Sequence, residues 1–349
     1  MVKLSPFRIP LAPLNVMDYG THADGVTNDA DHFETAMDAA VAAGKRLWVP
    51  PGVYYFTTHL TPPNNLYMFG PGASARLIRY DDDSMSTPIL FYIVSTSNVS
   101  LHRMALEGST ATANTSALLV KVGTSANPTL DALSFDKCYY GLKADSQCAG
   151  TNTGLQVLDC TAGADCQNPV YTSNTTGAYF RAPNFYAATY ATNLATPHHF
   201  YIAGACDDIT IDDAVLINGH AYSIQVYPSA AGNVTFNNLT LTNVTNGVAV
   251  YANNNPVTID GFTGTSNRMG TDAPWFTFQS GATNVTVKNF TITGDPAAAD
   301  YLIYVNAAGT GNLFQDGTIT SSAYLGNTPP GCLLQNGGSL PTYSNVTVS

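Results

Sequence analysis

The candidate catalytic groups in this chain are carboxylates that lie away from its regular strand pattern. Hydrolysis of a glycosidic bond needs two carboxyl groups, one protonated as the acid and one ionised as base or nucleophile. Carboxyl groups about 5 Å apart give retention at the anomeric carbon, and a separation of about 6.5 to 9.5 Å gives inversion. The four candidates for acid and base are Glu107, Asp159, Asp165 and Asp207.

The segment from Gly163 to Ala205 departs most from the regular pattern and is rich in aromatic residues. Long loops on a rigid scaffold often carry binding sites, and aromatic rings stack on sugar faces. Packing of these rings against the protein's own body is an equally good interpretation. The candidate substrate-binding residues of this segment are Arg181, His198, Tyr179 and Tyr186.

Charge separates two kinds of chemistry in the central part of the chain. Between Lys143 and Arg268 the only lysine or arginine is Arg181. A lyase must neutralise a uronate and abstract its α-proton, whereas hydrolysis needs only the two carboxyl groups. We therefore favour a hydrolase, while a lyase that uses His198 or His220 with Tyr222 stays open.

A second acidic group is better explained by structure than by catalysis. Asp208, Asp212 and Asp213 align with asparagines of other repeat copies, at corners where Asn or Asp satisfies backbone groups. Asp208 and Asp212 lie four residues apart along a strand, about 13 Å, so they cannot share one ion in a straight strand. We predict no metal site and no cofactor.

The elements that must position these residues are strands of a repeat. An apolar-polar-apolar triplet, a polar corner and a Thr-rich apolar run recur from Val99 onward. Such a unit cannot bury its apolar face alone, so the copies must stack, and we predict an all-β fold, a parallel β-solenoid. The copies begin at Val99, Leu133, Leu155, Ile209, Val234, Val257, Val285 and Leu313.

The residue five positions after each repeat start should point inward. This predicts one buried column of Met104, Cys138, Cys160, Ala214, Leu239, Phe262 and Phe290. Cys138 and Cys160 are then buried thiols that could just bridge adjacent coils, although free cysteine is the simpler interpretation. The state of Cys148, Cys166, Cys206 and Cys332 is open, and most of the Asn-X-Ser/Thr sequons are interpreted as corner asparagines rather than glycosylation sites.

Near the N-terminus the apolar spacing changes to that of a helix. Phe33, Ala36, Met37, Ala40 and Val41 follow the i, i+3, i+4, i+7 pattern, which predicts a helix from Asn28 to Ala43. The first coil of a solenoid exposes apolar surface and strand edges, so this helix should cover it as a lid. We expect a single elongated body with no second globular domain.

Composition limits the partners. The formal charge is −11 and only 11% of residues are charged, so nucleic acid and anionic lipid are unlikely partners. No apolar run of 18 residues exists, so no membrane insertion is expected. The first 13 residues lack the apolar segment of a secretory signal and Met1 is present, which favours assembly in the cytoplasm.

The N-terminal region resembles the opening signature of the pectate-lyase-like right-handed parallel β-helix superfamily, which bacteriophage tailspikes and depolymerases commonly carry. The matching runs are Asn15 to Gly20, Ala23 to Asp29, the helix, and Val49 to Tyr54. In this family those residues shape a turn and a helix start, so no catalytic residue is carried over. The resemblance implies a right-handed parallel β-helix in which residues 15–80 form the capping helix and first coils and 81–349 the body.

Three hypotheses follow from the residues and the resemblance together. The first is a phage tailspike-type virion protein, a homotrimer that binds and hydrolyses a bacterial surface polysaccharide and docks onto other virion tail proteins through residues 1–14. The second is a non-enzymatic receptor-binding or structural rod of the virion. The third is a free, secreted bacterial polysaccharide lyase.

Overall fold

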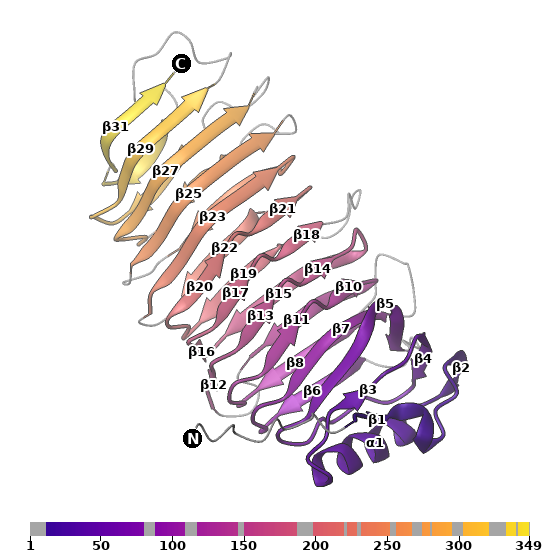
Figure 1. The fold of residues 1–349 in the computed structure, drawn as a ribbon. Helices are drawn as coiled ribbons and strands as arrows, with labels where there is room; N and C mark the ends of the chain where they lie inside the picture. Colours follow the sequence, from indigo (N-terminus) through magenta and orange to yellow (C-terminus); the bar gives the residue numbers. More distant parts are fainter. Residues whose placement is uncertain are drawn as a thin grey trace, which may run out of the picture.

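The protein is an elongated stack of β-coils with a helix at its N-terminal end, as the computed structural model shows (Figure 1). The residues that the structure describes are 12–79, 88–108, 117–145, 150–186, 198–219, 222–228, 232–251, 256–266, 274–279, 281–294, 303–320, 333–339 and 341–348.

Two long parallel sheets run along the stack. The smaller sheet takes one strand from each coil and has ten strands. They are β6 (Ile89–Val94), β8 (Leu118–Gly123), β11 (Cys138–Ala144), β15 (Cys166–Ser173), β19 (Phe200–Gly204), β22 (Tyr222–Pro228), β24 (Asn246–Val250), β26 (Phe276–Phe278), β28 (Ile303–Ala308) and β30 (Leu333–Gly338).

The larger sheet has nineteen strands, because many coils contribute two short strands joined at a corner. In the N-terminal half they are β1 (Leu14–Asn15), β2 (Asp24–Asn28), β3 (Leu47–Trp48), β4 (Gly52–Phe56), β5 (Tyr67–Arg79), β7 (Ser100–Gly108), β9 (Thr129–Asp131), β10 (Ser134–Asp136), β13 (Gln156–Leu158) and β14 (Thr161–Ala162). The others are β17 (Tyr179–Arg181), β18 (Asn184–Tyr186), β20 (Ile209–Asp212), β21 (Val215–Ile217), β23 (Val234–Thr242), β25 (Val257–Ser266), β27 (Val285–Gly294), β29 (Leu313–Thr320) and β31 (Thr342–Val348). A third, two-stranded sheet pairs β12 (Asn152–Thr153) with β16 (Thr175–Thr176).

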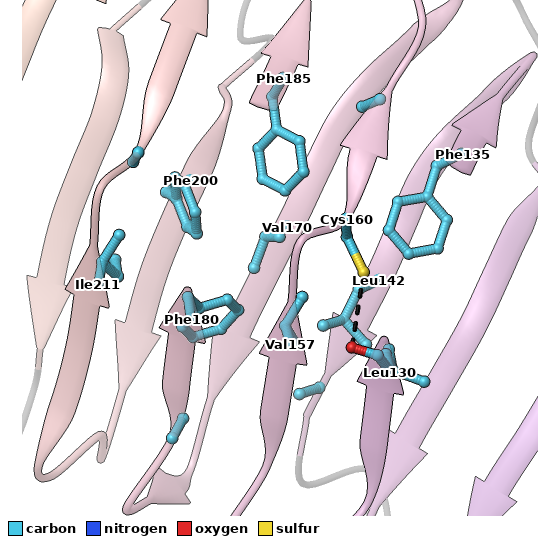
Figure 2. Close-up of a cluster of buried hydrophobic side chains, with 14 of the residues drawn as sticks. Leu130, Phe135, Leu142, Val157, Cys160, Val170, Phe180, Phe185, Phe200 and Ile211 are labelled. Carbon is cyan, nitrogen blue, oxygen red and sulfur yellow. Dashed lines mark hydrogen bonds between the residues drawn. The ribbon is translucent and has the colours of Figure 1, made fainter. Parts of the chain in front are cut away.

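Each described strand pairs in parallel with its counterpart in the next coil, as in β23 with β25 and β25 with β27. This confirms the predicted parallel solenoid. The interior is filled by stacked apolar side chains: Phe180 and Phe185 both pack against Phe200, at ring-centroid distances of 5.4 and 5.3 Å (Figure 2). Burial of such residues along the whole stack supplies the main favourable term in its stability.

Asparagine and aspartate occupy the corners of the coils, as predicted. Asp208, Asp213, Asn238 and Asn289 have φ between 51° and 55°, the left-handed region that these two residue types tolerate best. Asn238 Nδ2 also donates to Asp213 Oδ1 of the preceding coil at 3.0 Å. Asp208 and Asp213 are therefore corner residues first, whatever else they do.

The predicted inward column is right at six positions and wrong at Cys138. Ser134 pairs with Ala105 and with Thr161, so Leu133 is the residue that stacks between Met104 and Cys160. The repeat copy placed at Leu133 in fact starts one strand earlier, at Pro128, because the following residue, Thr129, pairs with Ser100. The apolar triplet after Leu133 has the same pattern as the one after Pro128, and the sequence pattern cannot distinguish the two strands of one coil.

Cys138 belongs to the smaller sheet, where it pairs with Cys166. The two Sγ atoms are 3.2 Å apart, and both thiols are buried and unbridged. Cys160 and Cys206 are also buried free thiols, and Cys160 Sγ lies 3.6 Å from the Leu130 carbonyl oxygen (Figure 2). Cys148 and Cys332 lie outside the described residues.

The Gly163 to Ala205 segment is not one long loop. It contains the five strands from β15 to β19, and β17 pairs with β13 on one side and β20 on the other. A complete coil was missed in this segment because its triplet, Tyr179-Phe180-Arg181, lacks the usual β-branched residues. Only residues 187–197 of the segment lie outside the described part.

A helix, α1 (Ala30–Ala42), follows the 3-10 turn η1 (Val16–Tyr19) and covers the N-terminal end of the stack (Figure 1). Phe33, Met37 and Ala40 are fully buried, which confirms the predicted lid face. The Phe33 ring packs edge-on against Tyr54 and Phe56 at 5.2 and 5.0 Å. The helix starts after Asp29 rather than Asn28, whose side chain instead accepts a hydrogen bond from the Ala30 N–H at 3.3 Å.

Candidate functional site

Three carboxylates meet where the larger sheet ends and the smaller sheet begins. Glu107 of β7 and Asp136 of β10 are register partners in adjacent coils, which places their backbones about 4.8 Å apart. Asp165 lies in the turn between β14 and β15, one coil further, and its N–H donates to the Asp136 carboxylate. Stacking of coils therefore brings together residues almost 60 positions apart in sequence.

Glu107 is held as a carboxylate by two cations. Arg76 donates through Nε to Oε1 at 2.8 Å and through Nη2 to Oε2 at 2.9 Å, and Lys137 Nζ lies 3.2 Å from Oε2. The hydrogen bond from Arg76 lowers the pKa of Glu107 most, and burial opposes it only in part. Glu107 is consequently ionised at neutral and mildly acidic pH.

The pKa of Asp136 is shifted in the opposite direction. Burial raises the pKa of Asp136 most, and the negative charges of Asp165 and Glu107 raise it further. Hydrogen bonds from the N–H groups of Lys137 and Asp165 lower the pKa but only partly offset these effects. Its Oδ1 atom is buried without a partner. A Cβ on Gly163 would lie 2.5 Å from this oxygen, so glycine there leaves the space that the carboxyl group occupies.

The surroundings thus shift the pKa values of the two register partners in opposite directions. An ionised Glu107 can act as base or nucleophile, and a protonated Asp136 can donate a proton. Environments that drive neighbouring carboxyl groups to opposite protonation states are typical of catalytic sites, although structural ion pairs also shift pKa values.

A face of tyrosines and lysines begins directly beyond this edge, on the smaller sheet. One outward row of the sheet consists of register partners on four successive strands, namely Lys121, Lys143, Tyr171 and Tyr201. We call this row with Tyr140 and His198 the tyrosine face.

Within this face the cations are partly neutralised and the rings contact one another. Lys121 Nζ lies 2.7 Å from Asp145 Oδ1, and Lys143 Nζ lies 3.3 Å from Oδ2 of the same carboxylate. Lys143 Nζ also lies 5.4 and 5.5 Å from the ring centroids of Tyr140 and Tyr171. The two lysines thus share one carboxylate beside aromatic rings, and such rings can stack on the face of a sugar.

His198 lies two residues before β19, the strand that carries Tyr201. Its Nδ1 is 2.7 Å from the Tyr222 carbonyl oxygen, and its ring stacks on Tyr201 at 5.3 Å. Because a carbonyl only accepts, Nδ1 carries the proton and Nε2 keeps a lone pair in the neutral ring. Burial lowers the pKa of His198, so the neutral form predominates at pH 7.

Half of the sequence-predicted site residues come together at this edge. Glu107 and Asp165 flank Asp136, and His198 lies on the tyrosine face. Tyr186 is level with Gly163 in the neighbouring coil, and 41% of its surface is exposed. His220, the alternative histidine, lies outside the described residues.

Asp159 and Arg181 form a separate surface pair. Asp159 is a corner residue with φ 52°, and its Oδ2 lies 2.5 Å from Arg181 Nη2. Each side chain is nearly half exposed. This geometry gives Asp159 a corner role and Arg181 a partner, and it places neither of them beside Glu107.

Asp207 and Tyr179 lie at the other edge of the larger sheet. Asp207 forms a bridge with Thr176 and accepts a hydrogen bond from the Asn233 N–H at 3.3 Å. Tyr179 is hydrogen-bonded to Asp212. The four candidate carboxylates therefore do not share one site, and any acid and base among them come from the Glu107 and Asp165 group.

Asp136 was missed from sequence because the misplaced repeat at Leu133 made it look like a corner residue. In the correct register it occupies the same outward position as Glu107, and that alignment was the available signal. Nothing in the sequence pattern pointed to Lys121 and Tyr201 as site residues, since their contacts join different coils.

Among the described residues, no group of three or more His, Cys, Asp or Glu side chains could hold a metal ion. No helix in that part of the chain is long and apolar enough to span a membrane.

Comparison with known proteins places the chain in a family. The family model described as rhamnogalacturonase A/epimerase, pectate lyase-like, matches residues 14–272, well over half of the chain. This protein belongs to that pectate lyase-like family. The match covers α1, the acidic edge and the tyrosine face, so all of the candidate site lies inside it.

Curated relatives match over short stretches. Mannuronan C5-epimerase AlgE6 of Azotobacter vinelandii is 33% identical over 109 residues, 28% of this chain and 12% of that protein. Mannuronan C5-epimerase AlgE5 of the same organism is 31% identical over 106 residues, 27% of this chain and 11% of that protein. The chain spans only about a tenth of the length of these relatives.

Solved structures share the fold at low identity. A double mutant of the tailspike protein of E. coli bacteriophage HK620 superposes with a TM-score of 0.71 at 12% identity, covering 96% of this chain and 65% of that one. The exopolygalacturonase of Thermotoga maritima gives 0.63 at 12% identity, covering 98% and 93%. The AlgE6 A-module gives 0.56 at 19% identity, covering 96% and 99%.

Proposed function

We propose that this family member binds a polysaccharide along the tyrosine face and hydrolyses it at the adjoining acidic edge. The observation that carries the proposal is the register pair Glu107 and Asp136, whose pKa values are driven in opposite directions beside an aromatic, weakly cationic surface. Relatives and structural neighbours that bear polysaccharide-acting names support the substrate class.

In this mechanism Asp136 protonates the glycosidic oxygen as the bond to the anomeric carbon breaks. Glu107 either attacks that carbon or takes a proton from the water that does so. The Asp165 charge helps to keep Asp136 protonated, and Arg76 and Lys137 keep Glu107 ionised.

The setting that we propose is a phage tailspike-type virion protein acting on a bacterial surface polysaccharide. The fold shared with the HK620 tailspike supports this setting. Assembly as a homotrimer and attachment to other tail proteins through residues 1–14 are parts of the same proposal. A non-enzymatic receptor-binding rod would use the tyrosine face without the acidic edge, and a secreted bacterial enzyme would use both.

A second activity is favoured by one specific observation. His198 is neutral with a free Nε2 lone pair and stacks on Tyr201, the second neighbour of Lys143 along the row. A neutral base near a cation can abstract the α-proton of a uronate, the chemistry of a lyase or an epimerase. The curated relatives are named as mannuronan epimerases.

Release of reducing ends from host surface polysaccharide tests the hydrolase. Asp136→Asn and Glu107→Gln should each abolish turnover and leave polysaccharide binding intact, because each removes a proton-transfer group at nearly unchanged shape. Asp159→Asn is the matched control and should keep full activity. Equal activity in all three variants would place the site elsewhere.

Product chemistry separates the alternatives. A lyase leaves an unsaturated sugar that absorbs ultraviolet light, and an epimerase exchanges substrate hydrogen with deuterated water without chain cleavage. Loss of either signal in His198→Gln, with Asp136→Asn unaffected, would favour proton abstraction. Binding without any of these products would favour the receptor-binding rod.

A further inference from the structure

A polar hollow lies on the larger sheet, at the edge away from the acidic cluster. Its volume is about 380 Å³, within the range of small-ligand sites. It crosses three successive coils and is lined by Asp208, Ile209, Thr210, Asn233, Thr235, Pro256 and Thr258.

The hollow coincides with an interruption of the corner ladder. At the same corner nearer the N-terminus, Asn98 Nδ2 donates to Asn65 Oδ1 at 2.9 Å and Asn127 Nδ2 donates to Asn98 Oδ1 at 3.2 Å. Asp208 keeps the left-handed corner conformation with φ 51°, but the next position is Asn233, which does not. This ladder ends at Asn127, because the next two corner positions are Gly154 and Gly177, which carry no side chain, and it does not resume between Asp208 and Asn233.

The groups that the interruption releases face the solvent. Asp208 and Asn233 are both exposed, and within the described part of the chain neither side chain has a hydrogen-bond partner. Beside them Thr210, Thr235 and Thr258 form one outward row at coil spacing, about 4.8 Å. A carboxylate, an amide and three hydroxyls together supply both acceptors and donors.

This donor and acceptor set, with its charge, selects a class of ligand. The lining holds one carboxylate and no lysine or arginine, and the Asp207 carboxylate lies next to it, so an anionic sugar would be repelled. The vicinal hydroxyls of a neutral sugar both donate to a carboxylate and accept from an amide or hydroxyl. Pro256 offers a small apolar surface for the C–H face of the ring.

We propose that this hollow is a binding subsite for a neutral hexose unit, separate from the acidic edge. It would hold a sugar on the opposite edge of the larger sheet and anchor a glycan without cleaving it. The proposal does not depend on hydrolysis at Asp136, since a receptor-binding rod could use the same subsite.

Saturation-transfer NMR on the full chain tests the proposal. The probes are the methyl glycosides of glucose, galactose, mannose and N-acetylglucosamine, with methyl glucuronide as the anionic comparison. We expect saturation transfer to at least one neutral glycoside. The affinity should fall about tenfold or more in the Asp208→Asn, Thr235→Val double variant, because hydrogen bonds to a charged group and a hydroxyl are lost.

Both substitutions nearly preserve shape, and asparagine tolerates the corner conformation at 208. Thr129→Val, on the same sheet but three coils away from the hollow, is the matched control and should bind as the wild type does. Tyr171→Ala distinguishes sugar bound in the hollow from sugar bound on the tyrosine face. It should leave the saturation transfer that arises from the hollow unchanged. Absence of signal from every neutral glycoside, or equal signal in the double variant and wild type, would overturn the proposal.

Discussion

At the residue scale, Glu107 and Asp136 show how surroundings assign roles to similar side chains. Two hydrogen-bonded cations stabilise the charge of Glu107, whereas burial and two neighbouring carboxylates disfavour the charge of Asp136. Neither effect belongs to the residue alone. Each depends on side chains from adjacent coils.

The first prediction concerns the pH dependence of cleavage. Activity should rise with pH through the lowered pKa of Glu107, which must be ionised, and fall through the raised pKa of Asp136, which must be protonated. The optimum of kcat/KM should therefore be acidic. Lys137→Gln should move the acid limb to higher pH and leave the alkaline limb in place, since the Lys137 ammonium pairs with Glu107, whereas it is the Lys137 backbone N–H that bonds to Asp136. An unmoved acid limb would contradict the assignment.

The second prediction concerns Gly163. A methyl group at this position would meet Asp136 Oδ1 at 2.5 Å and displace the carboxyl group. Gly163→Ala should lower kcat at least tenfold while changing the midpoint of thermal unfolding little, because the displaced group lies at the edge of the core. Gly44→Ala is the control for activity: no atom lies within 4 Å of the added carbon, so it should keep its activity, while its φ of 60° strains the alanine and should lower the midpoint of unfolding.

The third prediction concerns His199, which is fully buried. Burial lowers the pKa of His199 from 6.5 to about 4, so as pH falls the unfolded chain takes up the proton before the folded one does. Stability should decrease from about pH 6.5 to about pH 4, by roughly 3 kcal/mol from this residue, and level off below. In urea unfolding, the free energy of unfolding of His199→Gln should depend less on pH than that of the wild type. His59→Gln, at an exposed position, is the control and should keep the wild-type pH dependence.

At the element scale, α1 closes the N-terminal end of the stack. It buries Phe33 and Met37 against the first coils, and Glu34 Oε1 accepts a hydrogen bond from the Thr61 N–H at 2.5 Å. The helix is therefore held to the body by apolar packing on one face and by a backbone contact beside it. Removing the lid would expose the apolar cross-section of the first coil.

The fourth prediction tests this lid. Met37→Asp should lower the free energy of unfolding by several kcal/mol, because it buries an unpaired charge. Thr35→Asp adds the same charge to the exposed face of the same helix and should change stability by less than about 0.5 kcal/mol. Equal denaturation midpoints for the two variants would contradict the lid assignment.

At the scale of the whole molecule, the C-terminal coils present rows of outward threonines. Thr263, Thr291 and Thr318 are register partners on β25, β27 and β29, and all three are exposed. Such a face is flat and uncharged, and burying it between identical chains costs little desolvation of charge. This is the surface that we expect to mediate the proposed trimer.

The fifth prediction is that the purified chain sediments as a trimer at micromolar concentration. Thr291→Lys should convert it to a monomer, because it adds like charges around a three-fold axis, and Lys45→Ala at the N-terminal end should have no effect. A monomeric wild type would count against self-association, unless residues 1–14 need a virion partner to hold the trimer.

Much of this architecture follows from local pattern. The strand triplets, the corner asparagines and the spacing of Phe33, Met37 and Ala40 predict strands, turns and a helix, because each depends on neighbours within a few residues. The parallel solenoid follows too, since a repeat of that length can bury its apolar face only against its own copies.

Register and protonation were decided only by the tertiary structure. Leu133 and Pro128 begin similar triplets, and only the pairing of the next residues, Ser134 with Ala105 and Thr129 with Ser100, shows which triplet opens the coil. That same stacking joins Asp136 to Glu107 and places Asp208 between Gly177 and Asn233. The sequence determined that the chain forms stacked coils of strands and corners, because that pattern is local. The chemistry of the site depends on which side chains lie one coil apart, and a repeat of variable length does not reveal that spacing.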